Sequence, residues 1–317
     1  MDIVVLLTPE LMYYHNLPRT SVGRNLVFVE VPYSQGPGLF TNLIIYHELG
    51  HFVFDKQTAG RGNAAFTQLV RAMKTAFDKR LGRIPRASDK AWAKRVLKNW
   101  TVEVFCDLFA LRFIGPAFTF ALIDFLSLIG QGTTDVIFVE EHPAPALRLK
   151  VQIERLKRDG WWDAVGDMPS DHVRLSKELA SKQNYKFVVS ETPVPRFIEA
   201  FLEILPHIQM LVNALTPDPR PAARDFQRQR KQIEKCYSEG VVPSHLVKQG
   251  TTESPLQVSI LNAAYSFYLT SIPTLMEKMC HNPARLDKRS ELTAKLESWT
   301  LKALEDCQLY AASRKGD

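Results

Sequence analysis

Two histidines and a glutamate in the segment LIIYHELGHFVF have the types and spacing that metal chemistry requires. His47 and His51 lie four residues apart, so on a helix both imidazoles leave the same face, one turn apart. That spacing lets both rings reach one Zn²⁺ ion at about 2.0–2.1 Å. Glu48 lies on the flank of this face, where it can take a proton from a metal-bound water without being a ligand. Chance predicts about 0.01 such patterns in a chain of this composition, so we favour a metal pair over two structural histidines in a core helix.

A catalytic zinc ion needs a third protein ligand, with one position left open for water. A pattern with Gly three residues and His six residues after His51 is excluded, because Phe54 and Gln57 stand there. The best candidate is Glu103 in NWTVEVFCDLFALRF, where an unpaired carboxylate on an apolar helix would be costly to bury. Asp107 follows one turn later and is placed to orient a ligand histidine. The alternative is that both acids cap or pair on a half-exposed helix.

With these residues the chain resembles the gluzincins, zinc metallopeptidases that pair HExxH with a Glu on a downstream helix. The segment HPAPALRL is similar to the HPxxxxR element of the branch that contains the CaaX prenyl proteases and the heat-shock membrane proteases. The resemblance covers roughly residues 25–155 and implies Zn²⁺ as cofactor and a protein or peptide as substrate. It also implies that His142 and Arg148 lie beside the zinc site. They either donate hydrogen bonds to the oxyanion of a tetrahedral intermediate or pair with the site carboxylates, and a helix cap with a structural salt bridge is the alternative.

Hydrophobic periodicity predicts the elements that hold these residues. Short β-branched segments at 3–7 and 26–31 predict strands. By the resemblance residues 29–32 line the substrate cleft, and an ordinary core strand is the alternative. We therefore predict an α+β fold, with a small N-terminal β-sheet packed on the zinc-binding helix pair and a mostly α-helical C-terminal region. A boundary near residue 160 would separate a gluzincin-like metallopeptidase domain, 1–160, from a helical domain of unknown role, 161–317. The expected helices are 40–55, 64–81, 88–114, 117–129, 144–158, 171–183, 195–214, 222–237, 255–279 and 286–312.

Composition argues for an ordinary globular protein. Among 317 residues, 45% are apolar and 23% are charged, which excludes a disordered or collagen-like chain. The four cysteines form no CxxC pair, and Cys106, close to Glu103, is either a small core hydrophobe or a redox-sensitive thiol near the metal. The start, MDIVVLLTPE, lacks the features of a signal peptide, and the apolar stretch Phe113–Gly130 is interpreted as a buried helix. We therefore expect a cytoplasmic protein without a membrane span.

These observations favour a zinc metallopeptidase, and an endopeptidase in preference to an exopeptidase, in which Glu48 activates water at the metal. One alternative is a catalytically silent or latent zinc-domain protein that acts as a peptide-binding, partner-binding or regulatory module. A second alternative gives the main role to nucleic-acid binding by the basic C-terminal half. The net charge of +6 is mild and the basic stretch 218–235 reads as a solvated helix face, so nucleic acid is not the expected partner. A regulatory protein partner, if there is one, is expected at the C-terminal helical region.

Overall fold

In a computed structural model of the chain, the described residues are 2–8, 14–16, 26–32, 38–59, 63–84, 86–128, 137–138, 140–182, 186–187, 194–216, 223–248, 251–253, 256–279 and 286–313. The described helices are α1 (Ile45–Ala59), α2 (Ala64–Arg80), α3 (Ala87–Ile114), α4 (Pro116–Leu128), α5 (Pro145–Arg158), α6 (Trp162–Val165), α7 (Asp171–Ser181), α8 (Val194–Leu215), α9 (Ala223–Ser238), α10 (Gln257–Met279) and α11 (Leu286–Ser313). The described strands are β1 (Asp2–Thr8), β2 (Tyr14–Asn16), β3 (Leu26–Pro32), β4 (Ile137–Phe138), β5 (Lys186–Phe187), β6 (Leu246–Lys248) and β7 (Thr251–Glu253). A 3-10 turn, η2 (Thr41–Ile44), leads into α1.

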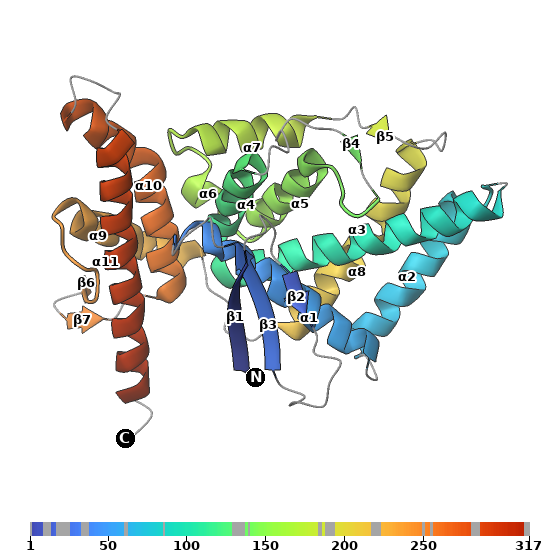
Figure 1. Cartoon of the computed structure of the whole chain (residues 1–317), viewed down its shortest axis with the longest axis horizontal. Coiled ribbons are helices and arrows are strands. Elements are labelled where there is room, and N and C mark those ends of the chain that lie inside the picture. The colour runs from blue at the N-terminus through green and yellow to red at the C-terminus, as the bar shows by residue number, and fades with distance from the viewer. Residues whose placement is uncertain are drawn as a thin grey trace.

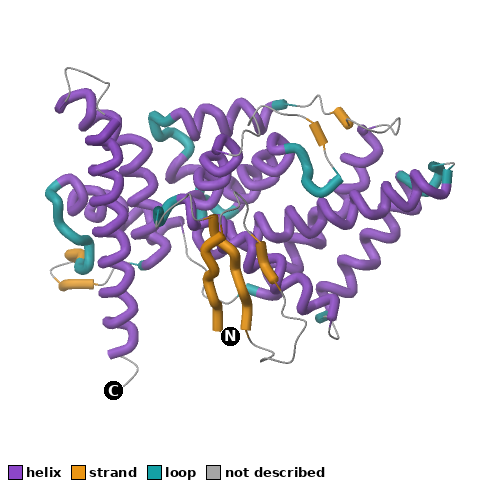
Figure 2. Tube along the Cα trace, in the orientation of Figure 1, coloured by secondary structure: helices purple, strands orange, loops and turns teal. Residues whose placement is uncertain are grey.

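The predicted α+β class is wrong, because the architecture is all-α. Most of the described residues are helical, and the described hydrophobic core is built almost wholly from helical side chains. Near the N-terminus, β1 runs parallel and β2 antiparallel to β3, and these short segments lie beside α1 (Figure 1). Figure 2 shows how little of the chain is extended. The expected sheet is therefore not a layer of the fold, because helices pack on helices and bury the apolar surface without it.

The helix positions expected from periodicity are confirmed, including the ranges expected for α2, α3 and α11. Their ends follow local rules. The Asn63 side chain accepts a hydrogen bond from the Phe66 amide and caps the start of α2. Gly115, with a φ of 64°, ends α3, and Pro116 then begins α4. Such signals lie within a few residues of each helix end, which is why the sequence alone locates these helices well.

Helices from both sides of residue 160 share one core. α8 packs along α2 and α3, α5 packs on α7, and α10 contacts α4 as well as α9 and α11 (Figure 1). At the α3–α8 contact the buried ring of Trp100 lies 6.1 Å from that of Phe197 and 6.3 Å from that of Phe201, between ring centroids. The long helix α3 therefore has helical neighbours on several sides, which fixes the position of the acidic residues in its second half.

Within the described part of the chain, α8 is the one helix long and apolar enough to cross a membrane, over Arg196–Leu215. It also contributes fully buried side chains, among them Phe197 and Ile208, to the shared core. The shorter α4, which covers most of the apolar stretch 113–130, is buried as expected. The absence of a membrane span stays a prediction.

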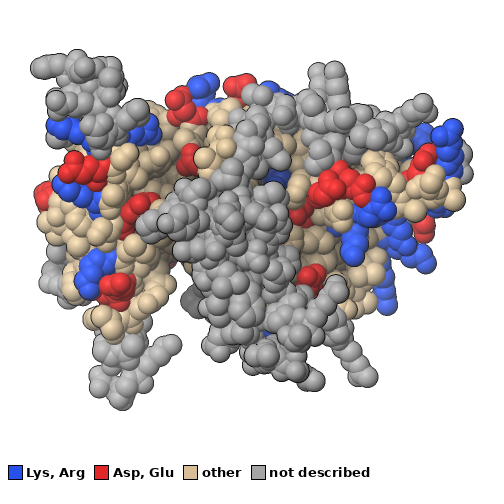
Figure 3. All heavy atoms as spheres, in the orientation of Figure 1, with Lys and Arg blue, Asp and Glu red and all other residues tan. Residues whose placement is uncertain are grey.

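Charge is unevenly distributed over the face shown in Figure 3. Acidic and basic side chains alternate over α9–α11, whereas several Lys and Arg side chains gather at the end of the molecule formed by α2 and α3 (Figure 3).

Candidate metal centre

The two helices that carry the predicted metal ligands touch backbone to backbone. α1 packs against α3, and a Cβ placed on Gly50 would lie 2.8 Å from the Cα of Cys106. A glycine inside a helix costs about 1 kcal/mol relative to alanine, so its place here reflects this close approach. The contact brings the first turns of α1 up to the second half of α3. As a result His47 and His51 face Glu103 across the helix crossing.

Three side chains place their donor atoms at nearly equal separations. The Nε2 atoms of His47 and His51 lie 3.2 Å apart. His47 Nε2 lies 3.4 Å from Glu103 Oε2, and His51 Nε2 lies 3.3 Å from Glu103 Oε1. Ligands bound tetrahedrally at about 2.0–2.1 Å from a zinc ion are separated from one another by about 3.3–3.4 Å. The two imidazole nitrogens and the Glu103 carboxylate, which makes these contacts through both of its oxygens, thus lie at separations that suit ligands of one zinc ion.

The contacts among the donors leave hydrogen-bonding capacity unused. Glu103 Oε2 is buried without a hydrogen bond of good geometry, although nitrogen atoms of His47 and His142 lie within 3.4 Å of it. Burial raises the pKa of the Glu103 carboxyl, but contacts with His142, His47 and His51 outweigh it and hold that pKa well below its usual range. A charged, buried oxygen with unused acceptor capacity fits a site for a cation. Two imidazoles and one carboxylate are a donor set that catalytic zinc sites use, so the residues fit that ion.

Asp107 fixes the orientation of His47, as predicted for the residue one turn after Glu103. Its Oδ1 lies 2.9 Å from His47 Nδ1, so Nδ1 donates to the carboxylate and Nε2 faces the other donors. Burial lowers the pKa of His47, but its contacts with Asp107 and Glu103 outweigh it and raise that pKa to about 10. A metal ion bound to Nε2 would therefore displace a proton from this nitrogen.

Arg148 reaches this centre through Asp107. Its Nε and Nη2 donate to the two Asp107 oxygens at 2.8 and 2.6 Å, a bidentate pair that is almost completely buried. Burial raises the pKa of Asp107, but the charges and hydrogen bonds of Arg148 and His47 together outweigh it and lower that pKa. Arg148 Nη2 also lies 3.8 Å from Glu103 Oε2. Of the two roles left open by the sequence, the geometry favours pairing with the carboxylates over donation to an oxyanion.

His142 and Glu48 complete the set of predicted site residues. His142 Nδ1 lies 3.0 Å from Glu103 Oε2, and its side chain is 41% exposed, so it stands between the buried donors and solvent. Glu48 is buried on α1 between the two histidines in sequence. The residues expected at the cleft from the strand, 29–32, belong to β3, but their side chains lie outside the described part of the structure.

Cys106 joins the cluster more closely than its weak sequence signal indicated. Its Sγ and the ring nitrogens of His47 and His51 all lie within 4.8 Å of one another. Burial raises the pKa of this thiol well above its usual value, and the charges of Glu103 and Glu48 raise it further. The signal that points to it is its place, three residues after Glu103 and thus on the same side of α3.

Comparison with known proteins gives no match, whether with protein-family models, with curated proteins or with solved structures.

Proposed function

We propose that the protein is a zinc-dependent metallopeptidase in which His47, His51 and Glu103 hold the ion. The observation that carries this proposal is the spacing of 3.2–3.4 Å between the two imidazole nitrogens and from each of them to one oxygen of Glu103, with Asp107 on Nδ1 of His47. Hydrogen-bonded side chains reach similar separations, but here the buried Glu103 Oε2 makes no hydrogen bond of good geometry. The pattern HExxH adds Glu48, a base that a purely structural site does not need.

The chain's own residues would divide the work of peptide hydrolysis. When bound, zinc would polarise the peptide carbonyl and lower the pKa of a water molecule. Glu48 would accept the proton of this water and pass it to the amine nitrogen as the C–N bond breaks. The chain from Arg148 through Asp107 would hold the His47 ring in place. His142, at the exposed edge, would keep the Glu103 carboxylate oriented.

The test compares the wild-type chain with Glu48→Gln, using Glu239→Gln at the exposed turn after α9 as the matched control. We expect about one zinc ion per chain in all three proteins, measured by elemental mass spectrometry. A search for new protein N-termini in cell extracts should find cleavage by wild type and Glu239→Gln. Glu48→Gln should cleave about 10²–10⁴ times more slowly, because it lacks the base. Equal cleavage by Glu48→Gln, or a wild-type chain that binds no zinc, would contradict the proposal.

A second candidate, a closed structural zinc centre in a partner-binding protein, is favoured by Cys106. Its sulfur lies within 4.8 Å of a ring nitrogen of each histidine, close enough to be considered as a fourth ligand. Zinc with four protein ligands has no open position for water and acts structurally. However, the Glu103 oxygens already lie at 3.3–3.4 Å from the imidazole nitrogens, a separation that suits ligands of one ion.

The two candidates differ in what Cys106→Ser does. If the protein is a peptidase, Cys106→Ser should have zinc affinity and cleavage close to wild type, because the thiol is not a ligand. If the centre is closed, Cys106→Ser should lose about tenfold or more in zinc affinity, measured by competition with a chelating dye. Cys236→Ser, at a half-buried position on α9, is the control for the loss of a thiol elsewhere.

A further inference from the structure

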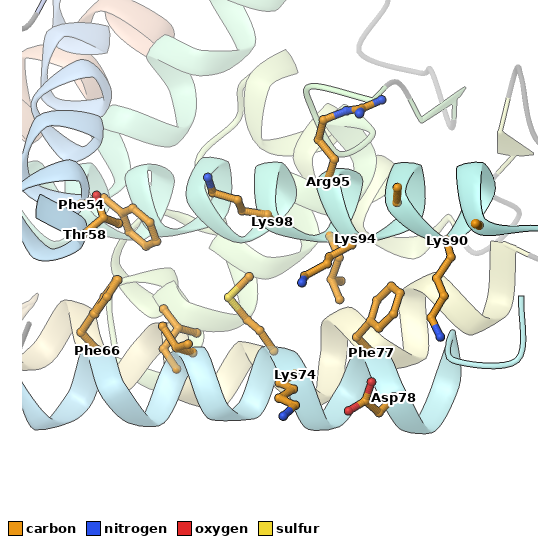
Figure 4. Close-up of a pocket in the computed structure, with 16 residues that line it drawn as sticks. Phe54, Thr58, Phe66, Lys74, Phe77, Asp78, Lys90, Lys94, Arg95 and Lys98 are labelled. Atoms are coloured by element: carbon orange, nitrogen blue, oxygen red, sulfur yellow. The ribbon is translucent and has the colours of Figure 1, made fainter.

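An apolar groove lies between α2 and α3, away from the metal donors. Its volume is about 940 Å³, within the range of binding pockets. In Figure 4, Phe66 and Phe77 extend from α2 toward α3, and Phe54 closes one end from α1. Val70, on the α2 side, is 49% exposed. We call this feature the α2–α3 groove. Its apolar lining includes Phe54, Phe66, Leu69, Val70, Met73 and Phe77.

One edge of the α2–α3 groove carries a row of cations. Lys90, Lys94 and Lys98 are exposed and follow one another at intervals of four residues along α3. Lys90 Nζ donates to the carbonyl of Gly82 at 3.3 Å. Among the described residues, no carboxylate lies within 4.0 Å of the amines of Lys94 or Lys98. In Figure 4, Lys90 and Lys94 extend from α3 toward the gap. The groove therefore combines an apolar floor with positive charge along its length.

We propose that the α2–α3 groove binds an acidic amphipathic helix of another protein. Successive lysines lie about 6 Å apart along α3, one helical turn each, so the row is about 12 Å long. A helix with carboxylates at every fourth residue presents charges at the same interval and pairs with the whole row. Its opposite stripe of leucines or similar residues would enter the apolar floor.

The distribution of charge argues against a lipid-like occupant. A fatty acid has one carboxylate at one end, so it would pair with a single lysine and leave the others without a partner. A neutral apolar ligand would leave the whole row unused. Binding of the helix does not require the metal centre, although α1 contributes residues to both. Phe54 of the groove follows His51 by three residues, and its ring lies 5.2 Å from that of Phe105, between centroids.

The test measures binding of a designed peptide to the full chain by fluorescence anisotropy. The peptide has about 16 residues, or roughly 24 Å of helix, with leucines on one stripe and glutamates at every fourth position beside it. The charge reversal Lys94→Glu/Lys98→Glu should weaken binding about tenfold or more, because attraction becomes repulsion. The matched control is Lys231→Glu/Lys235→Glu, an exposed pair with the same spacing on α9, which should bind as wild type does.

A second pair of variants tests the apolar floor. Val70→Glu puts a charge inside the groove and should also weaken binding about tenfold or more, whereas Leu301→Glu, at a similarly exposed position on α11, should not. Circular dichroism of the variants checks that each is folded, and the peptide should gain helix signal when bound.

Three outcomes would overturn the proposal. A scrambled peptide of the same composition could bind as tightly as the designed one, which would show that only charge matters. Palmitate could bind to the wild-type chain and not to Val70→Glu, while the designed peptide fails to bind, which would assign the groove to a lipid. Sedimentation could show a dimer that Val70→Glu converts to a monomer, which would assign the groove to a second copy of the chain.

Discussion

In the described part of the chain, two histidine–aspartate pairs lie at helix crossings, and one of them belongs to the candidate metal centre. His47 and Asp107 join α1 to α3 with 2.9 Å between Nδ1 and Oδ1. His172 and Asp124 join α7 to α4 with 2.6 Å between Nε2 and Oδ1. In the second pair the other Asp124 oxygen accepts a hydrogen bond from the hydroxyl of Tyr265 on α10, at 2.6 Å. We call these three residues the Asp124 cluster.

The difference lies in what surrounds each aspartate. Asp107 is 1% exposed and pairs with Arg148, and it binds only Nδ1 of His47, so Nε2 faces Glu103 and His51. The Asp124 side chain is 32% exposed, and its partners are a hydroxyl and a single imidazole. No second imidazole or further carboxylate is described beside it. A histidine–aspartate pair thus becomes a metal site only where other donors converge on its free nitrogen.

The largest effect that separates the two pairs is expected on zinc affinity. Asp107→Asn removes the negative charge and leaves one acceptor oxygen where His47 and Arg148 now use two, so it should lower zinc affinity about 10- to 100-fold. Asp124→Asn is the matched change at the other pair and should leave affinity unchanged. Competition with a chelating dye measures both. Equal affinities for the two variants would show that Asp107 does not support the centre.

A smaller effect is expected on stability when the Asp124 cluster is broken. Asp124→Asn weakens the contacts to His172 and Tyr265 that join α4 to α7 and α10. Because the carboxylate is partly exposed, we expect a loss of about 1–2 kcal/mol in the free energy of unfolding, measured with urea. The exposed change Asp163→Asn on α6 should cost less. A variant as stable as wild type would show that the cluster does not hold these helices together.

The smallest effect is a change in pH dependence. Burial raises the pKa of Tyr265 well above its usual value, and the Asp124 charge raises it further. In the unfolded chain a tyrosine ionises near pH 10, so this group's contribution to stability is present below about pH 10 and is lost as the pH rises through the folded-state pKa. Tyr265→Phe should therefore lose less stability than wild type between about pH 8 and pH 10.5. Tyr310→Phe, an exposed position on α11, should follow wild type, and identical slopes for all three would contradict the assignment.

The features that local sequence predicts are those with local causes. The helix periodicity, the caps and the His47–His51 spacing all lie within a few residues, and they place α1 and α3 correctly. Glu103 was found because a carboxylate in an apolar helix needs a partner. The Asp124 cluster was missed, because its members lie 48 and 141 residues from Asp124 and no motif links them. The fold class was predicted wrongly because the strand propensity of residues 3–7 and 26–31 is a local property. It does not show that helices make up most of the remaining described structure.

The α2–α3 groove was missed for a related reason. Lys90, Lys94 and Lys98 read as an ordinary solvated face when α3 is considered alone. Their meaning depends on the apolar side of α2, which reaches this position only because both helices pack on α8. Similarly, Arg148 had two open roles, and its bidentate contact with Asp107 is a tertiary feature.

The glycine at the crossing of α1 and α3 has a consequence for the size of ion that the site can select. A methyl group on Gly50 would meet the backbone of Cys106 at 2.8 Å, and a backbone gives way only if a whole helix moves. His47 and His51 would travel with α1, and Glu103 would remain with α3. Any increase in the distance between α1 and α3 would then lengthen the distances from the imidazole nitrogens to the Glu103 oxygens. Gly50→Ala is therefore expected to shift the preference of the centre from zinc toward a larger divalent cation such as cadmium. The residue at position 50 would then set the ionic radius that fits between the two helices.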